Sequence, residues 1–293
     1  MIDIELLRKD PEIIKRKVAD KQFNAQLVDK ALELDNKYRK LLQKVERLRA
    51  EKNKFAKDKN VEEGKRIKEQ LQKLEPELET TERKFLEVFK EIPNPPLSQV
   101  PVGKSEKENV EIRKWGKPRK FDFEPKSHLE LGKSLGILDF ETGAKVTGSQ
   151  FYFWYGDGVL MELALVFYAI ELLKKEGFIP IITPDLAKSR YYLGTGYIPR
   201  GNEAQIYEIK NEDLGLIATA EVTLAGKHAD EIISEDDLPL KYIGYSHCFR
   251  QEAGAYGKYS KGLYRVHQFT KAEMFIYCRP EESEKMHEHI LAM

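Results

Sequence analysis

The sequence predicts an α+β protein built from two unlike parts, a helical N-terminal arm and a domain of mixed helices and strands. Residues 1–92 contain one glycine, Gly64, and two prolines, Pro11 and Pro76, which is a composition typical of helices. A proline-rich segment, residues 92–103, ends this part. Beyond it glycine and aromatic residues become frequent, and short β-rich runs such as residues 150–155 occur.

The composition of the whole chain limits the possible classes of protein. A length of 293 residues is typical of about two domains. Lys and Arg total 49 and Asp and Glu total 49, so binding to nucleic acid would have to depend on local charge. The two cysteines, Cys248 and Cys278, have no metal-binding spacing and are expected to be reduced thiols. No apolar run is long enough to cross a membrane and no signal peptide is evident, so we expect a soluble, cytoplasmic protein.

The helical arm carries two series of mainly apolar residues at alternating spacings of four and three. Such a period of ~3.5 is typical of coiled coils. A break at residues 60–64 separates the two series, which predicts an antiparallel coiled-coil hairpin over about residues 27–92, roughly 40 Å long. Asp10-Pro11 predicts an earlier helix start, and Pro76 predicts a kink. The first series is Leu34, Tyr38, Leu41, Val45, Leu48, Lys52 and Phe55, and the second is Ile67, Leu71, Leu74, Leu78, Thr81, Phe85 and Val88.

Charge is distributed unevenly along this hairpin. Residues 49–68, around the expected turn, hold eight Lys or Arg against four Asp or Glu, whereas in residues 69–91 acids lead seven to four. A basic tip favours contact with phosphates, and Lys52, Lys54, Lys57 and Lys59 are its candidate residues. A solvated structural or oligomerisation element would show a similar pattern.

Residues 92–103 read as a stiff linker, because Pro93, Pro95, Pro96 and Pro101 fall within them. We therefore expect the domains to be residues 1–97 and 98–293. In the second domain, residues 159–177 are apolar nearly all round and predict a helix that is buried on more than one side and ends at Gly177. Residues 178–183 predict a strand. No P-loop or Rossmann motif is present, so any nucleotide must be held in another way.

A long-looped β-hairpin is predicted by residues 242–250 and 265–277, joined by a glycine-containing loop. Side chains alternate between the faces of a strand, so one face of the second strand carries Arg265, His267, Phe269, Lys271 and Glu273. Arg250 and Glu252 lie together at the end of the first strand. Arg suits a phosphate, Phe can stack on a base, and Glu can accept from an amine or hydroxyl. An exposed amphipathic hairpin with solvated charges is the alternative.

These residues resemble motif 2 of class II aminoacyl-tRNA synthetases, through Phe249-Arg-Gln-Glu252, Arg265-Val-His-Gln-Phe269 and Glu273. The helix ending at Gly177 and the strand closed by Pro184 resemble motif 1, which forms the dimer interface in that family. Three segments are similar to the seryl enzymes in particular: residues 148–153 (Gly-Ser-Gln-Phe-Tyr-Phe), residues 193–197 (Leu-Gly-Thr-Gly-Tyr) and Thr219-Ala-Glu221. The resemblance implies an antiparallel sheet flanked by helices. Nothing matches the glycine-rich motif 3, so we expect the C-terminal part of the fold to be absent from this sequence.

The resemblance also implies an activity and its residues. The family joins serine to ATP as seryl-adenylate, releases pyrophosphate, and transfers serine to the 3′ end of tRNA(Ser), and by implication of tRNA(Sec). Arg250 would be catalytic, binding the α-phosphate and the serine. The other serine residues would be Thr219, Ala220, Glu221 and Glu273, and the other ATP residues would be Gln251, Glu252, Arg265, Val266 and Phe269.

Further partners follow from the same resemblance. The loop at residues 254–262 would touch the acceptor end of tRNA, and the protein would be a homodimer. Mg²⁺ would accompany ATP, with its ligands expected in the absent C-terminal part, so we assign no metal ligand in this chain.

Three alternatives stay open from the sequence. One is another class II synthetase such as the phenylalanyl α-subunit, which also begins with a coiled coil. A second is a synthetase-like ligase that charges a carrier protein. A coiled-coil adaptor without enzymatic activity would explain residues 27–92 but not the hairpin chemistry.

Overall fold

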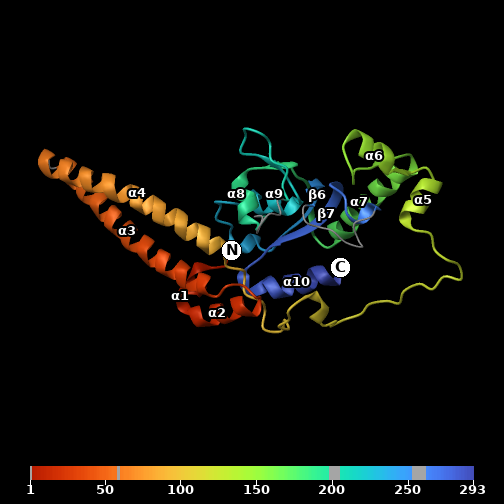
Figure 1. Ribbon diagram of the computed structural model, residues 1–293, viewed down its shortest axis with the longest axis horizontal. Coiled ribbons are helices and arrows are strands. Elements are labelled where there is room, and N and C mark those ends of the chain that lie inside the picture. The colour runs from red at the N-terminus through yellow and green to blue at the C-terminus, as the bar shows by residue number, and fades with distance from the viewer. Residues whose placement is uncertain (1, 58–59, 198–204, 253–261) are drawn as a thin grey trace. The chain divides into compact units, whose positions relative to one another are not determined.

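The structure, a computed structural model, describes residues 2–57, 60–197, 205–252 and 262–293 and divides into two compact units, Met1–Pro118 and Arg119–Met293 (Figure 1). The boundary lies beyond the proline-rich segment because backbone carbonyls of that segment are bound by the side chains of Lys17 and Gln22. Lys17 Nζ donates to the Pro96 carbonyl at 3.0 Å, and Gln22 Nε2 donates to the Gly103 carbonyl at 2.8 Å. The division into domains 1–97 and 98–293 remains our proposal.

The first unit is helical, as predicted. It contains α1 (Ile4–Lys9), α2 (Pro11–Asp20), α3 (Gln26–Lys57), α4 (Val61–Glu91) and a 3₁₀ turn, Glu106–Glu108. Asp10 is the N-cap of α2 and Pro11 is its first residue, which confirms the predicted start. The helices α3 and α4 pack against each other along the hairpin (Figure 1). Pro76 lies inside α4, which continues on both sides of it.

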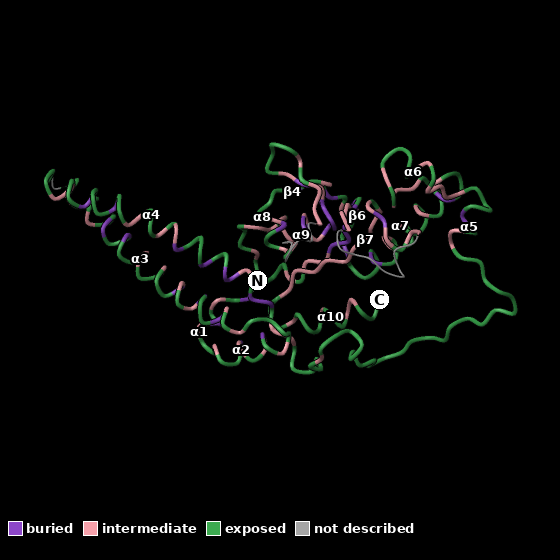
Figure 2. The backbone as a smooth tube through the Cα atoms, in the orientation of Figure 1, coloured by how far each residue is buried: buried purple, intermediate pink, exposed green. Residues whose placement is uncertain are grey.

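Apart from the exposed Lys52, the predicted seam faces the interior of the hairpin, where Figure 2 shows buried stretches along both helices. Val45, Leu48, Ile67 and Leu71 form one buried cluster. Nearer the chain's N-terminal helices, Phe85 stacks between Tyr38 and Phe89, with ring centroids 6.5 and 5.2 Å away. Burial of these apolar faces, worth about 1.5–3 kcal/mol for each large side chain, holds the two helices together.

A partly buried ion pair joins the short α1 to α3. Asp35, whose side chain is only 5% exposed, accepts from Arg8 Nη2 at 2.6 Å and Nε at 2.9 Å. The bidentate geometry satisfies both carboxylate oxygens, and the hydrogen bonds to Asp35 raise the pKa of Arg8. The sequence pattern did not predict this pair. Asp35 comes directly after the apolar seam residue Leu34 but is not itself part of the seam.

The second unit is built on a three-stranded sheet in the order β3–β6–β7, formed by Ile179–Ile182, Leu240–Phe249 and Gln268–Tyr277. The antiparallel pair of β6 and β7 extends over all ten residues of each strand, which confirms the predicted hairpin. The strand β3 joins β6 in parallel, so the sheet is mixed.

The helix α7 (Asp157–Lys175) matches the predicted apolar helix, and Gly177 follows it with φ of 84°, a left-handed conformation that suits glycine. The prediction that this helix is buried on more than one side is wrong for the single chain. Leu160, Leu165, Phe167 and Tyr168 are 63–67% exposed. One side of α7 packs on the sheet around Leu173, and the buried Gly158 at its start lies against Trp154 and Ile137.

Short elements complete the second unit. The run at residues 150–155 contributes only a two-residue strand, β2 (Phe153–Trp154), paired with β1 (Leu138–Asp139). A 3₁₀ turn at Pro280–Glu282 and then α10 (Ser283–Ala292) occur where the sequence predicts a helix near Pro280. The remaining elements are α5 (His128–Ser134), β1 (Leu138–Asp139), α6 (Phe140–Val146), β2 (Phe153–Trp154), β4 (Leu186–Ala187), α8 (Ser189–Gly194), β5 (Gly215–Leu216), α9 (Ala220–Lys227), α10 (Ser283–Ala292) and 3₁₀ turns at Glu235–Asp237 and Gly262–Tyr264. Within the described residues, no helix is long and apolar enough to span a bilayer.

The packing of α9 on the sheet brings the candidate site together. Gly244, on β6, lies directly under this helix. A Cβ at position 244 would come within 2.7 Å of Leu224 Cδ1 and 2.9 Å of Ala220 Cβ, distances that real Cβ atoms do not show. Only glycine therefore allows α9 to approach β6 so closely.

Candidate functional site

One face of the β6–β7 hairpin carries the candidate chemistry. Cys248 pairs with Phe269, Ser246 with Lys271 and Gly244 with Glu273, so these six residues share the face on which α9 packs. The predicted alternation along the second strand is therefore confirmed from Phe269 to Glu273. The strand itself is shorter than predicted, since β7 begins at Gln268 and Arg265 precedes it.

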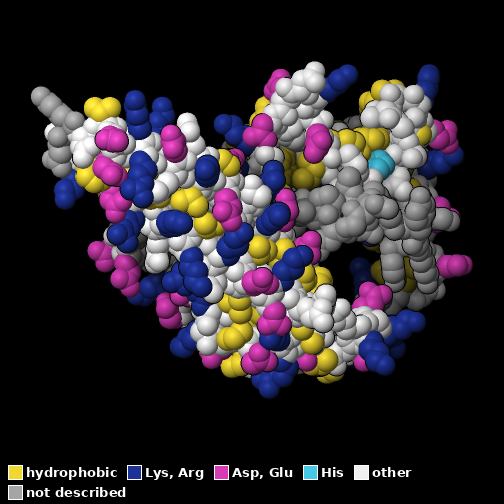
Figure 3. All heavy atoms as spheres, turned by 60° about the vertical axis from the view of Figure 1, so that its left-hand side comes forward, with side chains coloured by type: hydrophobic (Ala, Val, Ile, Leu, Met, Phe, Trp, Pro, Cys, Tyr) yellow, Lys and Arg dark blue, Asp and Glu magenta, His cyan; other side chains and the backbone are white. Residues whose placement is uncertain are grey.

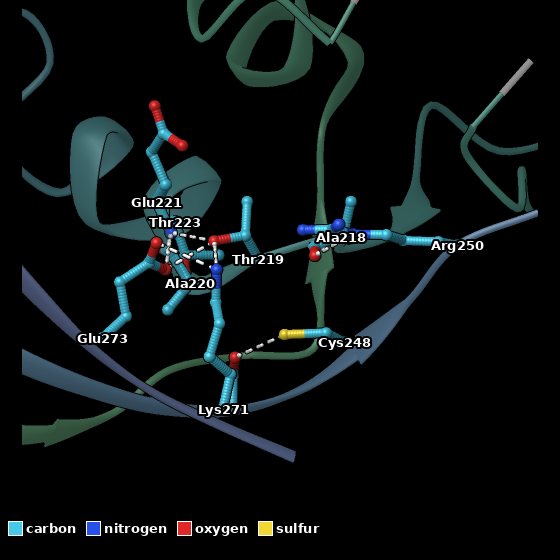
Figure 4. Close-up of polar contacts among 10 residues, drawn as sticks. Ala218, Thr219, Ala220, Glu221, Thr223, Cys248, Arg250, Lys271 and Glu273 are labelled. Atoms are coloured by element: carbon cyan, nitrogen blue, oxygen red, sulfur yellow. Dashed lines mark hydrogen bonds and ion pairs between the residues drawn. The ribbon is translucent and has the colours of Figure 1, made fainter. Parts of the chain in front are cut away.

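The N-terminus of α9 meets Glu273. Thr219, fully buried, is the N-cap of this helix, and its hydroxyl donates to Glu273 Oε2 at 2.5 Å. The backbone N–H of Glu221 donates to the same carboxylate oxygen at 3.1 Å and to Thr219 Oγ1 at 3.2 Å. The resemblance assigned the segment Thr219-Ala-Glu221 and Glu273 to one serine site, and the structure brings them into contact (Figure 4). A carboxylate at a helix N-terminus is also stabilised by the helix dipole.

Lys271 completes this cluster. Its Nζ donates to Thr219 Oγ1 at 2.6 Å and to Glu273 Oε1 at 2.9 Å (Figure 4). The sequence placed Lys271 on the correct face but gave it no role. Its position between Phe269 and Glu273 at strand spacing was the available signal.

Burial and like charge raise the pKa of Glu221. Desolvation is the larger cause and the nearby Glu273 is the second, while Lys271 acts in the opposite direction. Burial also raises the pKa of Tyr197, with Glu221 as a further cause. Tyr197 is the last residue of the segment at residues 193–197 that resembles the seryl enzymes. The end of this segment therefore lies close enough to the cluster for its charges to act on the Tyr197 hydroxyl.

Arg250 and Phe269 form a second part of the site. The guanidinium carbon of Arg250 lies 5.2 Å from the centroid of the Phe269 ring, a distance at which the cation is attracted to the aromatic face. Arg250 Nε also donates to the Ala218 carbonyl at 3.3 Å, directly before Thr219 (Figure 4). The chain thus brings a cation and an aromatic ring next to the Thr219 cluster.

The remaining predicted ATP residues lie around the end of the hairpin. Arg265 Nη1 and Glu252 Oε2 form an ion pair at 3.1 Å between partly buried side chains. Gln251 uses its side-chain amide to donate to the Ile206 carbonyl at 2.8 Å, and Val266 is buried. His267 Nδ1 lies 2.9 Å from the Arg250 carbonyl and fixes the backbone there. Of the predicted tRNA loop at residues 254–262, residues 254–261 lie outside the described residues.

Comparison with known proteins places this geometry in a family. Residues 1–96 match the seryl-tRNA synthetase N-terminal domain, and residues 206–293 match the class II tRNA synthetase core domain for G, H, P, S and T. The serine–tRNA ligase of Dictyoglomus turgidum is 49% identical over 100% of this chain and 72% of its own length. That of Rubrobacter xylanophilus is 47% identical with the same coverage. This chain belongs to the seryl-tRNA synthetase family.

Solved seryl-tRNA synthetases agree with the fold. The Pyrococcus horikoshii enzyme complexed with ATP superposes with a TM-score of 0.86 at 37% identity, covering 100% of this chain and 73% of that one. The cytoplasmic serine–tRNA ligase of Naegleria fowleri in complex with AMP gives 0.82 at 33% identity, with coverage of 100% and 70%. The predictions of a class II fold and of a serine-specific aminoacyl-tRNA ligase are confirmed at the level of the family, and the alternative synthetases and the adaptor are not favoured.

The basic tip of the arm is partly described. Lys52, Lys54 and Lys57 are exposed near the end of α3, whereas Lys59 lies outside the described residues. Further from the tip, cations are neutralised across the hairpin: Arg49 pairs with Glu75 at 2.7 Å. Figure 3 shows Lys and Arg side chains interspersed with acidic ones on the molecular surface.

Two observations concern metals and thiols. Among the residues that the structure describes, no group of three or more His, Cys, Asp or Glu is arranged to hold a metal ion. Cys248 is a buried free thiol whose pKa is raised by burial, and Cys278 is a partly buried free thiol.

Proposed function

We propose that this protein activates L-serine with ATP, forming seryl-adenylate and pyrophosphate, and then transfers the seryl group to the 3′ end of tRNA(Ser) and of tRNA(Sec), in the cytoplasm. The contact of Thr219, Lys271 and Glu273 beside the Arg250–Phe269 pair carries the proposal, because it combines an amino-acid pocket with a phosphate-binding cation. The names of the relatives and their complexes with ATP and AMP support it.

Serine recognition is assigned to the cluster at the N-terminus of α9. In the proposal, Thr219, Ala220 and the Glu221 carboxylate surround the substrate ammonium, and Glu273 reads the hydroxyl. Alanine is smaller than serine, so size cannot exclude it. Exclusion must come from a buried polar group that is left unpaired when the hydroxyl is missing, and such an effect can reach ~10⁴-fold.

ATP is assigned to the end of the hairpin. Arg250 binds the α-phosphate and stabilises the charge that develops as the serine carboxylate attacks phosphorus and pyrophosphate leaves. Its contacts with Phe269 and the Ala218 carbonyl would orient it in advance. Phe269 stacks on adenine, Gln251, Glu252 and the Val266 backbone contact the adenine end, and Arg265 reaches the γ-phosphate. Since Arg265 pairs with Glu252 in the free protein, ATP has to share or replace that pair.

Mg²⁺ accompanies ATP in this proposal and would offset the charge of its phosphates. The described residues contain no group of three or more candidate ligands, so we assign no Mg²⁺ ligand and no step to them.

The helical domain, residues 1–97, is proposed to bind tRNA, and residues 98–293 to carry the amino-acid chemistry. The exposed Lys52, Lys54 and Lys57 near the end of α3, with Lys59 beyond them, support contact with tRNA phosphates.

A homodimer is proposed through α7. Its exposed face is apolar over several turns, which a monomer in water would rarely leave uncovered. Sedimentation of the full-length protein at micromolar concentration should give twice the chain mass, and a monomer under these conditions would reject the interface.

Amino-acid-dependent exchange of pyrophosphate into ATP tests the proposed activity. We expect serine to support exchange well above alanine, threonine, glycine and phenylalanine. Equal exchange with phenylalanine would indicate another class II specificity, and no exchange with any of the five would reject the activation step.

A further inference from the structure

Lys271 is the one residue of the cluster that has no part in the substrate contacts assigned above. It lies on β7 between Phe269 and Glu273, each proposed to contact a substrate. Its side chain is 27% exposed and that of Glu273 is 22% exposed, so their ion pair at 2.9 Å is only partly screened by water. Lys271 also reaches across from the strand to the N-cap of α9 through Thr219.

The hydrogen bonds of Thr219 fix the direction of its hydroxyl proton. A threonine hydroxyl has one donor and two acceptor sites. Lys271 Nζ and the Glu221 N–H both donate to Thr219 Oγ1, which fills the two acceptor sites. The single proton is then directed to Glu273 Oε2 at 2.5 Å. Without the Lys271 ammonium, one acceptor site of Thr219 would be free and the hydroxyl could rotate.

Counting the hydrogen-bond sites of Glu273 in the same way leaves room for one more donor. An ionised carboxylate offers about four lone-pair sites. Among the described residues, Lys271 donates to Oε1, and Thr219 and the Glu221 N–H donate to Oε2. Three of the four sites are therefore filled, which leaves about one, and a substrate hydroxyl supplies one donor.

The net charge of the cluster also suits an amino acid. Glu221 and Glu273 together carry two negative charges when ionised, and Lys271 supplies one positive charge, so the three groups sum to minus one. The ammonium of an amino acid neutralises that remaining charge. Other polar or titratable groups also lie close to the cluster, namely Arg250, Cys248 and Tyr197.

We propose that Lys271 is a positioning residue for amino-acid selection, which holds Glu273 and Thr219 so that one acceptor of Glu273 stays free for the serine hydroxyl. This inference rests on the proposed function of the site. Lys271 itself contacts neither the hydroxyl nor ATP in this arrangement, and it acts through Glu273.

The test is Lys271→Ala in the full-length protein, studied by pyrophosphate exchange. We expect KM for serine to rise at least about tenfold, as for loss of a charge-assisted hydrogen bond. KM for ATP should stay within about twofold, and the preference for serine over alanine should fall. Ethylammonium added to the assay should restore part of the serine KM, because a small cation can occupy the space of the missing side chain.

Lys241→Ala is the matched control. Lys241 lies on the neighbouring strand β6, and its Nζ donates to the Glu176 carbonyl at 3.3 Å, away from the cluster. Lys241→Ala should have the same KM values for serine and ATP as the unsubstituted protein, and ethylammonium should affect the two proteins equally. Lys271→Arg, which keeps the charge with a different geometry, should fold if the alanine variant does not, and should still lose preference for serine.

Two results would overturn the inference. One is an unchanged serine KM and selectivity in both Lys271 variants. The other is an equal loss for serine and alanine that ethylammonium does not restore, which would indicate a purely structural lysine. If the unsubstituted protein shows no serine-dependent exchange, the proposed function fails instead, so the two failures are distinguishable.

Discussion

At the scale of single residues, the proposed role of Glu221 in binding the serine ammonium comes with a cost to the stability of the fold. Burial and the charge of Glu273 raise its pKa above the ordinary value of 4.5. The folded protein therefore binds this proton more tightly than the unfolded chain does. The resulting stabilisation is present at low pH and is lost as pH rises from about the ordinary pKa through the raised one. Ionisation of Glu221 thus lowers the free energy of unfolding.

Glu221→Gln should consequently make the protein more stable and less active. We expect a higher Tm at pH 7.5, because the desolvated charge is removed, and a raised KM for serine, because the ammonium loses its partner. At pH 4 the gain in Tm should shrink, since Glu221 is then largely protonated. Thermal melts at the two pH values check this, and an equal gain at both would show that its charge is not the cause.

Sequence periodicity predicted residues whose roles depend on neighbours along one strand. Phe269 and Glu273 were placed on one face by the alternation of side chains along a strand, whereas Thr219 and Glu221 were identified by the resemblance to the seryl enzymes. Lys271 was seen on that face without a role, because its contact with Thr219 spans 52 residues of sequence. The Arg8–Asp35 pair was not predicted for the same reason, because it joins two separate helices. Asp35 is a polar residue beside the apolar seam, so the pattern gave it no partner.

At the scale of elements, β7 holds both ends of α9. Glu273 accepts from the N–H of Glu221 near the start of the helix, and Tyr277 Oη donates to the carbonyls of Leu224 at 2.5 Å and Ala225 at 3.0 Å near its end. The two contacts are four residues apart on each element, from Glu273 to Tyr277 on the strand and from Glu221 to Ala225 on the helix. The strand therefore fixes the position of α9 along the sheet.

Tyr277→Phe should loosen the end of α9 without touching the pocket. We expect KM for serine to rise about two- to fivefold, as for loss of a neutral hydrogen bond, while KM for ATP changes less. Steady-state exchange with each substrate varied in turn measures this difference. Tyr155→Phe, which changes an exposed tyrosine, serves as control. Equal changes in both KM values would mean that α9 does not depend on Tyr277.

Helices and strands with a regular apolar pattern could be predicted from the sequence, but the surfaces that pack against them could not. The coiled-coil hairpin and the β6–β7 hairpin follow from periods of ~3.5 and 2 in the sequence. The close approach of α9 to β6 depends on Gly244, a single glycine within an apolar strand. For α7 the apolar pattern correctly predicted a helix, but hydrophobicity does not say whether the covering surface comes from the same chain.

At the scale of the whole molecule, the arm and the pocket should be separable in function. Replacing Lys52, Lys54, Lys57 and Lys59 by Gln should weaken tRNA binding and flatten its dependence on salt, by about 0.7–0.9 in the log–log slope for each phosphate that these lysines neutralise. Serine-dependent exchange should not change. Lys37→Gln is a control, because Lys37 already pairs with Glu77 at 2.9 Å. An unaltered slope in the fourfold variant would exclude these lysines from the tRNA interface.

The central claim is that Glu273, held by Thr219 and Lys271, selects serine by its hydroxyl. The most direct measurement is pyrophosphate exchange by Glu273→Ala with serine and with alanine. Since alanine has no hydroxyl to be read, the variant should lose most of its serine activity and far less of its weak alanine activity, so the ratio of the two kcat/KM values narrows. If both activities fell together and the ratio stayed the same, Glu273 would be a general contact for the amino group or the fold, and the claim would be contradicted.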